Sequence, residues 1–405
     1  MSVEPLPPAE QVSEPLAPPE KTRRPSQPLF ADAVAMVRAL KPSYPVYCMR
    51  PHIVKRSATA FLEAFDGRVL YAVKCNPHPL ILRPLYEAGV RHFDTASLTE
   101  ITQVRELFRD AECYFMHPVK GRSAIRMADE VYQVEHFVVD TMDELHKVLD
   151  EAGGEGLAII VRIATPSAGA AYELSNKFGA RQQEAVELLQ AIKAEGCQAG
   201  LAFHVGSQCP SPRAFKTALG MVGEILDAAK VDLHYLDVGG GFPALYIGQD
   251  IPPLSDFFAE IEEGVKDLKL RRDCVLMCEP GRALVADSMS VVTQVHQRRG
   301  DTVYINDGIY GSLSETVTAR LRFPVRPIRL EGPEFSEDMM DFTVYGPTCD
   351  STDVLPMPIR LPADVKEGDW IEFGRIGAYS NALTTRFNGF FPDAYVTVED
   401  EPLEV

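Results

Sequence analysis

A regular alternation of strand and helix patterns constrains the fold of this 405-residue chain more than any other feature. Short apolar runs recur along its first two thirds, and helical patterns with one apolar face separate them. We predict eight strands, at Val69–Lys74, His92–Ala96, Cys113–His117, His136–Asp140, Leu157–Ile163, Gly200–Gly206, Leu233–Gly239 and Cys274–Glu279. The clearest helices are predicted at Leu98–Phe108, Thr141–Glu151, Gln182–Glu195, Arg213–Lys230 and Leu254–Leu268. Eight strand–helix units in series favour an α/β fold with a closed parallel (β/α)8 barrel, the TIM barrel; an open doubly wound sheet is the alternative.

The segments that flank the barrel pattern have a different character. Residues 1–30 carry eight prolines and no apolar periodicity, which predicts a disordered, Pro-rich tail. From Val303 to Tyr395, short β patterns alternate with glycine and proline turns, as is typical of an antiparallel β domain. We therefore expect a barrel at 45–295 and a C-terminal β domain at 296–405, with a contribution from about 31–50.

The composition argues against several classes of protein. A net charge of −18 and a pI near 5.0 disfavour binding to nucleic acid or to an anionic membrane, which needs clustered Lys and Arg. No apolar run approaches the roughly 20 residues of a membrane span, and the N-terminus has no signal-peptide core. The eight cysteines have no metal-type CxxC spacing. They indicate reduced thiols in a cytoplasmic protein without a metal site.

The carboxyl ends of the predicted strands carry most of the reactive side chains. In a closed barrel these ends meet at one mouth. They bring together Lys74, Asp94, His117, Asp140, Arg162, His204, the glycines 239–241, Glu279 and the pair Gly281-Arg282. Each has a structural interpretation by itself: Lys74 as a solvated strand end, His204 as a core histidine, Asp94 as a helix cap. Their occurrence at successive strand ends predicts a functional site at the mouth.

The chemistry of these residues indicates a phosphorylated aldehyde as cofactor. A lysine near other cations, or partly desolvated, loses some of its proton and becomes an amine suited to a Schiff base, which we expect of Lys74. The segment Asp237–Pro243 contains three successive glycines, so that backbone N–H groups can approach an anion closely. Arg282 adds a cation after the eighth strand, and barrels often bind phosphate with their last two loops. Pyridoxal 5′-phosphate has both the aldehyde and the phosphate.

Six segments resemble, in the same order, motifs of the ornithine decarboxylase branch of the alanine-racemase-fold (fold type III) pyridoxal phosphate enzymes. They are Tyr71–Asn76, Phe203–Gln208, Asp237–Pro243, Cys278–Arg282, Gly346–Asp350 and Gly377–Tyr379. The resemblance extends from about residue 45 to 398. It implies decarboxylation of a basic L-amino acid in polyamine biosynthesis, with L-ornithine (giving putrescine) or L-lysine as substrate.

The resemblance also implies a role for each residue at the barrel mouth. Lys74 would carry the cofactor as a Schiff base, Glu279 would pair with the pyridine nitrogen, and His204 would stack on the ring. The other implied cofactor-binding residues are Asp94, Arg162, Ser207, Gly240, Gly241, Gly281, Arg282 and Tyr379. For Arg162, a buried ion pair within the barrel is the structural alternative.

A homodimer with shared active sites is a further implication of the resemblance. Cys349 would reach the active site of the partner subunit and protonate the product carbon, and Asp350 would bind the distal ammonium of the substrate. Tyr310 and Ala319 take the remaining substrate-binding positions. A buried structural cysteine and a turn aspartate are the alternative for Cys349 and Asp350.

Ala319 departs from the family pattern, in which an acidic residue at this position contacts the terminal ammonium of the substrate. Glu315 could compensate only in a different local register, while Arg320 and Arg322 leave open a substrate with a distal carboxylate. Loss of one charge-assisted contact costs about 1.5–3 kcal/mol. An atypical amino-acid substrate is therefore an alternative to ornithine and lysine.

Two other functions compete with decarboxylation. A racemase of the same fold needs a second base, for which Tyr310 and Tyr345 are candidates, but the pair Cys349-Asp350 favours decarboxylation. A non-catalytic regulatory homologue usually loses the lysine's supporting residues or the phosphate-binding set. This chain retains Lys74, His204, Glu279, Arg282, Cys349 and Tyr379, which favours an enzyme.

Overall fold

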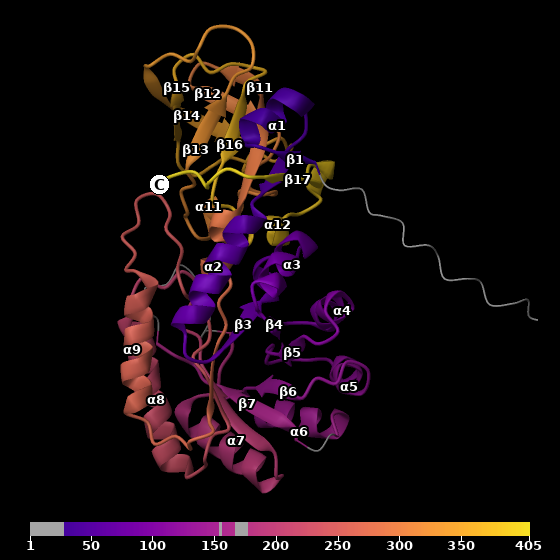
Figure 1. The fold of residues 1–405 in the computed structure, drawn as a ribbon, viewed down its shortest axis with the longest axis vertical. Helices are drawn as coiled ribbons and strands as arrows, with labels where there is room; N and C mark the ends of the chain where they lie inside the picture. Colours follow the sequence, from indigo (N-terminus) through magenta and orange to yellow (C-terminus); the bar gives the residue numbers. More distant parts are fainter. Residues whose placement is uncertain (1–27, 154–155, 167–176) are drawn as a thin grey trace, which may run out of the picture.

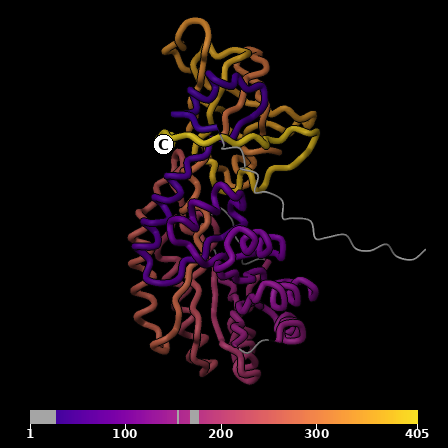
Figure 2. The backbone as a smooth tube through the Cα atoms, turned by 45° about the vertical axis from the view of Figure 1, so that its right-hand side comes forward, coloured from indigo at the N-terminus to yellow at the C-terminus, as the bar shows by residue number. Residues whose placement is uncertain are grey.

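A computed structural model describes residues 28–153, 156–166 and 177–405 of the chain. Of the tail predicted at 1–30, residues 1–27 lie outside the described residues, and Leu29–Phe30 form the short strand β1. Figures 1 and 2 show a barrel in the lower half of the molecule and a β domain in the upper half. This arrangement confirms the predicted fold class.

Eight parallel strands close the barrel in the order β10-β3-β4-β5-β6-β7-β8-β9. They are β3 (Arg68–Ala72), β4 (His92–Thr95), β5 (Glu112–Phe115), β6 (His136–Val139), β7 (Ala158–Arg162), β8 (Gln198–Ala202), β9 (Tyr235–Asp237) and β10 (Val275–Cys278). The closing pair sets Met277 of β10 opposite Arg68 of β3. Each strand overlaps one of the eight predicted from the sequence, because apolar runs buried between barrel and helices are the strongest local signal for such strands.

Helices surround the barrel on its outside (Figure 1). They are α2 (Pro51–Ala64), α3 (Pro79–Glu87), α4 (Leu98–Leu107), α5 (Arg122–Glu130), α6 (Met142–Glu151), α7 (Gln182–Ala194), α8 (Arg213–Ala229) and α9 (Leu254–Lys266). Hydroxyl caps fix two of their starts: Ser97 accepts the N–H of Glu100, and Thr141 accepts that of Glu144. Among the described residues, no helix is both long and apolar enough to cross a membrane.

The β domain contains a nine-stranded sheet. Its strands are β1, β2 (Val46–Met49), β11 (Met289–Arg299), β12 (Thr302–Ile305), β13 (Val325–Ile328), β14 (Met339–Tyr345), β15 (Ile359–Pro362), β16 (Trp370–Phe373) and β17 (Ala394–Val398). The sequence predicts an antiparallel sheet, but the observed sheet is mixed. β17 runs parallel to β1 and β2, and β12 runs parallel to β14. The strands of these pairs are far apart in the chain, so no hairpin imposes an antiparallel direction on them.

Short helices complete the β domain and join it to the barrel. They are α1 (Ala33–Leu40), α10 (Arg282–Val285), α11 (Glu315–Thr318) and α12 (Ser380–Leu383). The turn after β3 is hydrogen-bonded to the segment before α12: the N–H of Tyr379 donates to the carbonyl of Cys75, and the Asn76 amide donates to the carbonyl of Gly377 at 2.8 Å. The β domain therefore lies against the carboxyl ends of the barrel strands, where the sequence places its candidate site.

Candidate active site

Lys74 lies at the barrel mouth. β3 ends at Ala72, and Lys74 follows in the single turn η1 (Val73–Cys75). Its Nζ donates to a carboxylate oxygen of Asp94 at the end of β4. The Asp94 side chain is buried, whereas 40% of the Lys74 side chain remains exposed. A partly exposed lysine side chain is thus in direct contact with a buried carboxylate.

Carboxylates near Lys74 make the pKa of its amine differ from the one expected from the sequence. We expected burial or nearby cations to lower its pKa. Burial acts in that direction, but the carboxylates of Asp94 and Glu279 outweigh it and raise the pKa of Lys74 above its usual value. Lys74 is therefore held as an ammonium, and an acceptor must take its proton before it can act as a nucleophile.

Two further carboxyl groups lie close to this pair. Asp237 ends β9 and Glu279 follows β10 directly. Asp237 is fully buried, and its Oδ1 accepts the N–H of Gly239 at 2.8 Å. Burial and repulsion from Asp94 raise the pKa of both Asp237 and Glu279. Buried Asp237 and half-buried Glu279 are together suited to a cationic partner, such as a protonated ring nitrogen.

His204 presents a neutral imidazole to the mouth from the loop after β8. Its Nδ1 accepts the N–H of Gly206 at 3.0 Å, so the proton of the neutral ring is assigned to Nε2. Burial, followed by the charges of Arg162 and Lys74, holds the pKa of His204 well below its usual range. An uncharged ring in this place is suited to stacking on a flat aromatic group.

The glycine loop after β9 brings the last barrel loops into close approach. A Cβ at position 240 would lie 2.6 Å from the carbonyl oxygen of Glu279 and 2.9 Å from Nε2 of His204. Gly241 has a φ of +104°, and a Cβ there would lie 2.4 Å from the carbonyl oxygen of Gly206. Both positions therefore require glycine, and the loops after β8, β9 and β10 form one tight cradle.

Arg282 is the buried cation of this cradle, at the start of α10 and next to Gly281. Its Nη1 and Nη2 donate to the two carboxylate oxygens of Glu315 at 2.8 and 2.6 Å, and Nη1 also donates to the Tyr246 hydroxyl at 2.9 Å. Nε has no partner among the described residues. The sequence did not predict this ion pair. Glu315 is fully buried here and so does not substitute for an acidic residue at 319.

Ser207 and Tyr379 lie on two loops that border the cradle. Ser207 is half-buried in the loop after β8. The neighbouring Gln208 fixes this loop, because its side-chain amide donates to the carbonyl of Ala244 and accepts the N–H of that residue at 3.1 Å. The ring centre of Tyr379 lies 5.1 Å from Cζ of Arg282. The predicted phosphate-binding side chains thus come from loops that are rigidly held.

Arg162 is the last residue of β7 and is half-buried. Its Cζ lies 5.6 Å from the ring centre of Phe178. In the described ranges 28–153, 156–166 and 177–405, no carboxylate forms an ion pair with it, so the alternative of a buried ion pair finds no support there. Arg162 instead adds positive charge near His204.

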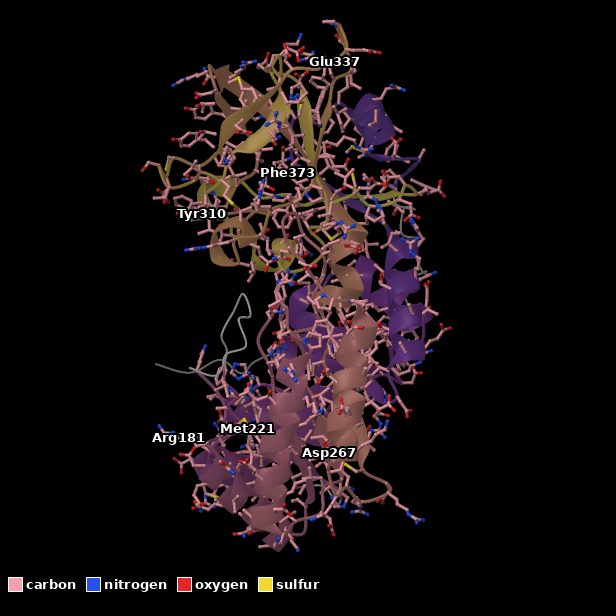
Figure 3. All side chains as sticks on the ribbon, turned by 90° about the vertical axis from the view of Figure 1, so that its left-hand side faces the viewer. Arg181, Met221, Asp267, Tyr310, Glu337 and Phe373 are labelled. Carbon is pink, nitrogen blue, oxygen red and sulfur yellow. The ribbon has the colours of Figure 1, made fainter. Side chains whose placement is uncertain are left out.

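The predicted substrate-binding residues lie in the β domain. Cys349 is exposed, and the Tyr310 hydroxyl donates to Oδ2 of Asp350. Cys349 and Asp350 line a cavity of about 850 Å³, and Figure 3 shows Tyr310 at the surface of the domain. Ala319 follows α11 and packs partly against the core. Within the described part of the chain, no hydrogen bond or ion pair joins Cys349 or Asp350 to the barrel mouth.

The donor set at the mouth fits pyridoxal 5′-phosphate. An amine is available for the aldehyde, a half-buried acid for the ring nitrogen, and a neutral imidazole for the ring face. For the phosphate, the unpartnered Nε of buried Arg282 lies beside a cradle of closely packed loops. An unpartnered buried donor calls for an acceptor, and a phosphate oxygen is one.

Known proteins resemble this chain in sequence and structure. Residues 51–286 match the family model "Pyridoxal-dependent decarboxylase, pyridoxal binding domain". The chain is 33% identical over 345 residues to the lysine/ornithine decarboxylase of Selenomonas ruminantium, covering 82% of this chain and 84% of the relative. It is 32% identical over 361 residues to a probable ornithine decarboxylase of Dictyostelium discoideum, covering 82% and 75%. The crystal structure of the Paramecium bursaria Chlorella virus arginine decarboxylase superimposes with a TM-score of 0.80 at 29% identity, covering 90% of this chain and 98% of the viral one.

Proposed function

The chain belongs to the pyridoxal-dependent decarboxylases, and on this premise we propose that it removes the α-carboxylate of a basic L-amino acid, L-ornithine or L-lysine. Family membership makes it an amino-acid decarboxylase with pyridoxal 5′-phosphate as its cofactor. The contact of Tyr310 with Asp350 carries the proposal of a basic substrate. The Tyr310 hydroxyl lowers the pKa of Asp350 and so favours a carboxylate able to bind a cationic group. In support, the similar proteins named above act, by their names, on lysine, ornithine or arginine.

In this proposal, each residue at the barrel mouth has a separate role in binding the cofactor. When bound, pyridoxal phosphate supplies the electron sink that the loss of CO2 requires. Glu279 would hold a proton at the ring nitrogen, and neutral His204 would cover one face of the ring and exclude water. Asp94 would position Nζ of Lys74 for the aldehyde through the contact between the two side chains. Arg162 adds a positive charge beside the ring.

The phosphate is assigned to the cradle of the last barrel loops. Backbone N–H groups of Gly240, Gly241 and Gly281 are available to it, together with the hydroxyls of Ser207 and Tyr379. The side chain of Arg282 provides the cation through its unpartnered Nε. Closely spaced N–H donors and one cation are a usual composition for a phosphate site.

The substrate side of the site is proposed to come from a second copy of the chain. Cys349 is exposed and lines an open cavity, as expected of a residue that acts across a homodimer interface. In the proposed dimer, Cys349 delivers a proton to the carbon that has lost CO2, and Asp350 binds the distal cation of the substrate.

The absence of an acidic residue at position 319, where the chain has Ala319, is the reason for a second candidate substrate class. Because Glu315 is committed to Arg282, only Asp350 is assigned to the distal group. One missing charge-assisted contact weakens binding by about 1.5–3 kcal/mol, or roughly tenfold to a hundredfold. A basic amino acid with a differently placed cation is therefore the second candidate substrate.

A substrate panel tests the proposal. Purified, cofactor-loaded protein is incubated with L-ornithine, L-lysine, L-arginine, diaminopimelate, L-glutamate and D-ornithine, and CO2 and amine products are followed by mass spectrometry. We expect putrescine or cadaverine, and no product from Lys74→Ala. Turnover of glutamate alone, or of no basic amino acid, would contradict the proposal.

A variant at position 319 separates the two substrate classes. Ala319→Asp introduces the second carboxylate. If ornithine or lysine is the substrate, its KM should fall about tenfold or more in the variant, while Ala319→Asn serves as an uncharged control of the same size. An unchanged KM with Ala319→Asp would indicate that the distal group does not lie near residue 319.

A further inference from the structure

Arg282 and Glu315 form a fully buried ion pair beside the proposed phosphate cradle. Only 2% of the Arg282 side chain and 0% of the Glu315 side chain are exposed to solvent. Arg282 is the first residue of α10, at the barrel mouth, and Glu315 is the first residue of α11, 33 residues later in the chain. Two donor–acceptor pairs, at 2.8 and 2.6 Å, join the end of the guanidinium to both carboxylate oxygens. This is the bidentate geometry of a strong arginine–carboxylate contact.

The ion pair leaves one edge of the guanidinium free. An arginine has five N–H donors in a planar fork. Glu315 takes one donor of Nη1 and one of Nη2, and the Tyr246 hydroxyl takes the other donor of Nη1. The donors that remain, on Nε and Nη2, point in parallel along one edge, and Nε is without a partner in the described structure. Such an edge matches two oxygens of a phosphate.

The charges of the pair have a consequence for the cofactor-free protein. A buried guanidinium without a counter-charge strongly destabilises a fold. The phosphate of the cofactor supplies that charge only while the cofactor is bound. Glu315 supplies it permanently, but its carboxylate also repels a phosphate that binds to the same guanidinium.

We propose that Glu315 is a built-in counter-anion for Arg282, a positioning residue that keeps the phosphate fork formed in the cofactor-free protein and moderates its affinity for phosphate. The inference rests on the proposed role of Arg282 in cofactor binding. It assigns to α11 two tasks: its first residue fixes the phosphate fork, and Ala319 directly after it lies at the proposed substrate position.

Glu315→Gln tests the proposal because glutamine keeps the shape of the side chain and removes the charge. The melting temperature of the cofactor-free variant should fall by about 5 °C or more. The affinity for inorganic phosphate, measured by calorimetry, should rise about tenfold, because the repelling charge is gone. Pyridoxal 5′-phosphate should raise the melting temperature of the variant more than that of the wild type. Pyridoxal, which lacks the phosphate, should raise both equally.

Glu372→Gln is the matched control. Glu372 is as deeply buried as Glu315 and pairs with Arg50 and Arg326, but it lies in the sheet of the β domain. Its loss should lower the melting temperature with and without cofactor and leave the phosphate affinity unchanged. This comparison separates the general effect of breaking a buried ion pair from an effect on the phosphate site.

Several results would overturn the role of Glu315. They are a phosphate affinity of Glu315→Gln equal to or below that of the wild type, an equal gain with pyridoxal and its phosphate, and a variant that does not fold even with saturating cofactor. Failure of the proposed function would look different, because the wild type itself would then bind no pyridoxal 5′-phosphate or release no CO2.

Discussion

At the scale of single residues, we expect the contact between Lys74 and Asp94 to govern how readily the cofactor is captured. Asp94 takes part in raising the pKa of Lys74, and a protonated amine does not bond an aldehyde. In Asp94→Asn this pKa should fall by about one unit or more, because an opposite charge in direct contact is removed.

The measurement is the rate of cofactor capture as a function of pH, followed by visible absorbance. The midpoint of this profile should move to lower pH in Asp94→Asn. The variant Asp66→Asn, at an exposed residue before β3, is the control and should keep the wild-type midpoint. An unchanged midpoint in Asp94→Asn would mean that another group sets the protonation of Lys74.

Asp237 should make the stability of the cofactor-free protein depend on pH. Burial, with repulsion from Asp94, raises its pKa to about 7. A carboxyl group with a raised pKa holds its proton more tightly in the folded chain than in the unfolded one. Its stabilising contribution is therefore complete below the usual carboxyl pKa of about 4 and is lost as the pH rises through about 7.

Urea unfolding of cofactor-free protein at pH 5 and pH 8 measures this effect. Between these values the wild type should lose at least about 1 kcal/mol more free energy of unfolding than Asp237→Asn. Glu63→Gln, at an exposed position of α2, should behave like the wild type. Equal losses in wild type and Asp237→Asn would show that Asp237 is ionised throughout this range.

At the scale of elements, the close approach of the loops after β8, β9 and β10 should make position 240 intolerant of a methyl group. In Gly240→Ala the new Cβ meets a backbone oxygen at 2.6 Å, which cannot move without separating the loops. We expect cofactor affinity to fall about tenfold or more, as measured by equilibrium titration. Gly220→Ala, in α8 with open space at its Cβ, is the control and should bind normally.

The elements of the barrel were predictable because their signals are local. Burial and apolar periodicity fix where strands occur, and the reactive residues follow from their positions at strand ends. The ends themselves were less predictable: β8 stops at Ala202, so His204 stands on a loop. The ion pair between Arg282 and Glu315 has no local signal, because the sequence shows an acidic residue but not which buried cation it neutralises.

At the scale of the whole molecule, the direction of the β-domain strands could not be predicted from the sequence for a similar reason. The pairing of β17 with β2 joins segments from opposite ends of the chain, and nothing in the residues of either strand specifies a parallel neighbour. The protonation of Lys74 is a different case. The sequence places Asp94 and Glu279 at the same barrel mouth as Lys74, but it does not show that they lie close enough to raise its pKa.

The proposed dimer makes the sharpest prediction about the whole molecule. If each site combines Lys74 of one chain with Cys349 of the other, Lys74→Ala and Cys349→Ala should each be inactive or nearly so as homodimers. A mixed dimer has one site with both defects and one with neither. Random exchange makes half of the dimers mixed, so an equimolar mixture should recover about a quarter of the wild-type activity.

The activity of the two variants is measured separately, directly after mixing, and after exchange in mild denaturant followed by its removal. Activity that appears only after exchange identifies subunit mixing as its source. Mixing Lys74→Ala with Glu279→Gln, both barrel-mouth residues of the same chain, should restore nothing, because every site then keeps a defect from its own chain. No recovery with Cys349→Ala would place all catalytic residues of a site within one chain, and the exposed cavity around Cys349 would need another occupant. Recovery in the control would instead mean that Lys74 and Glu279 of one site come from different chains.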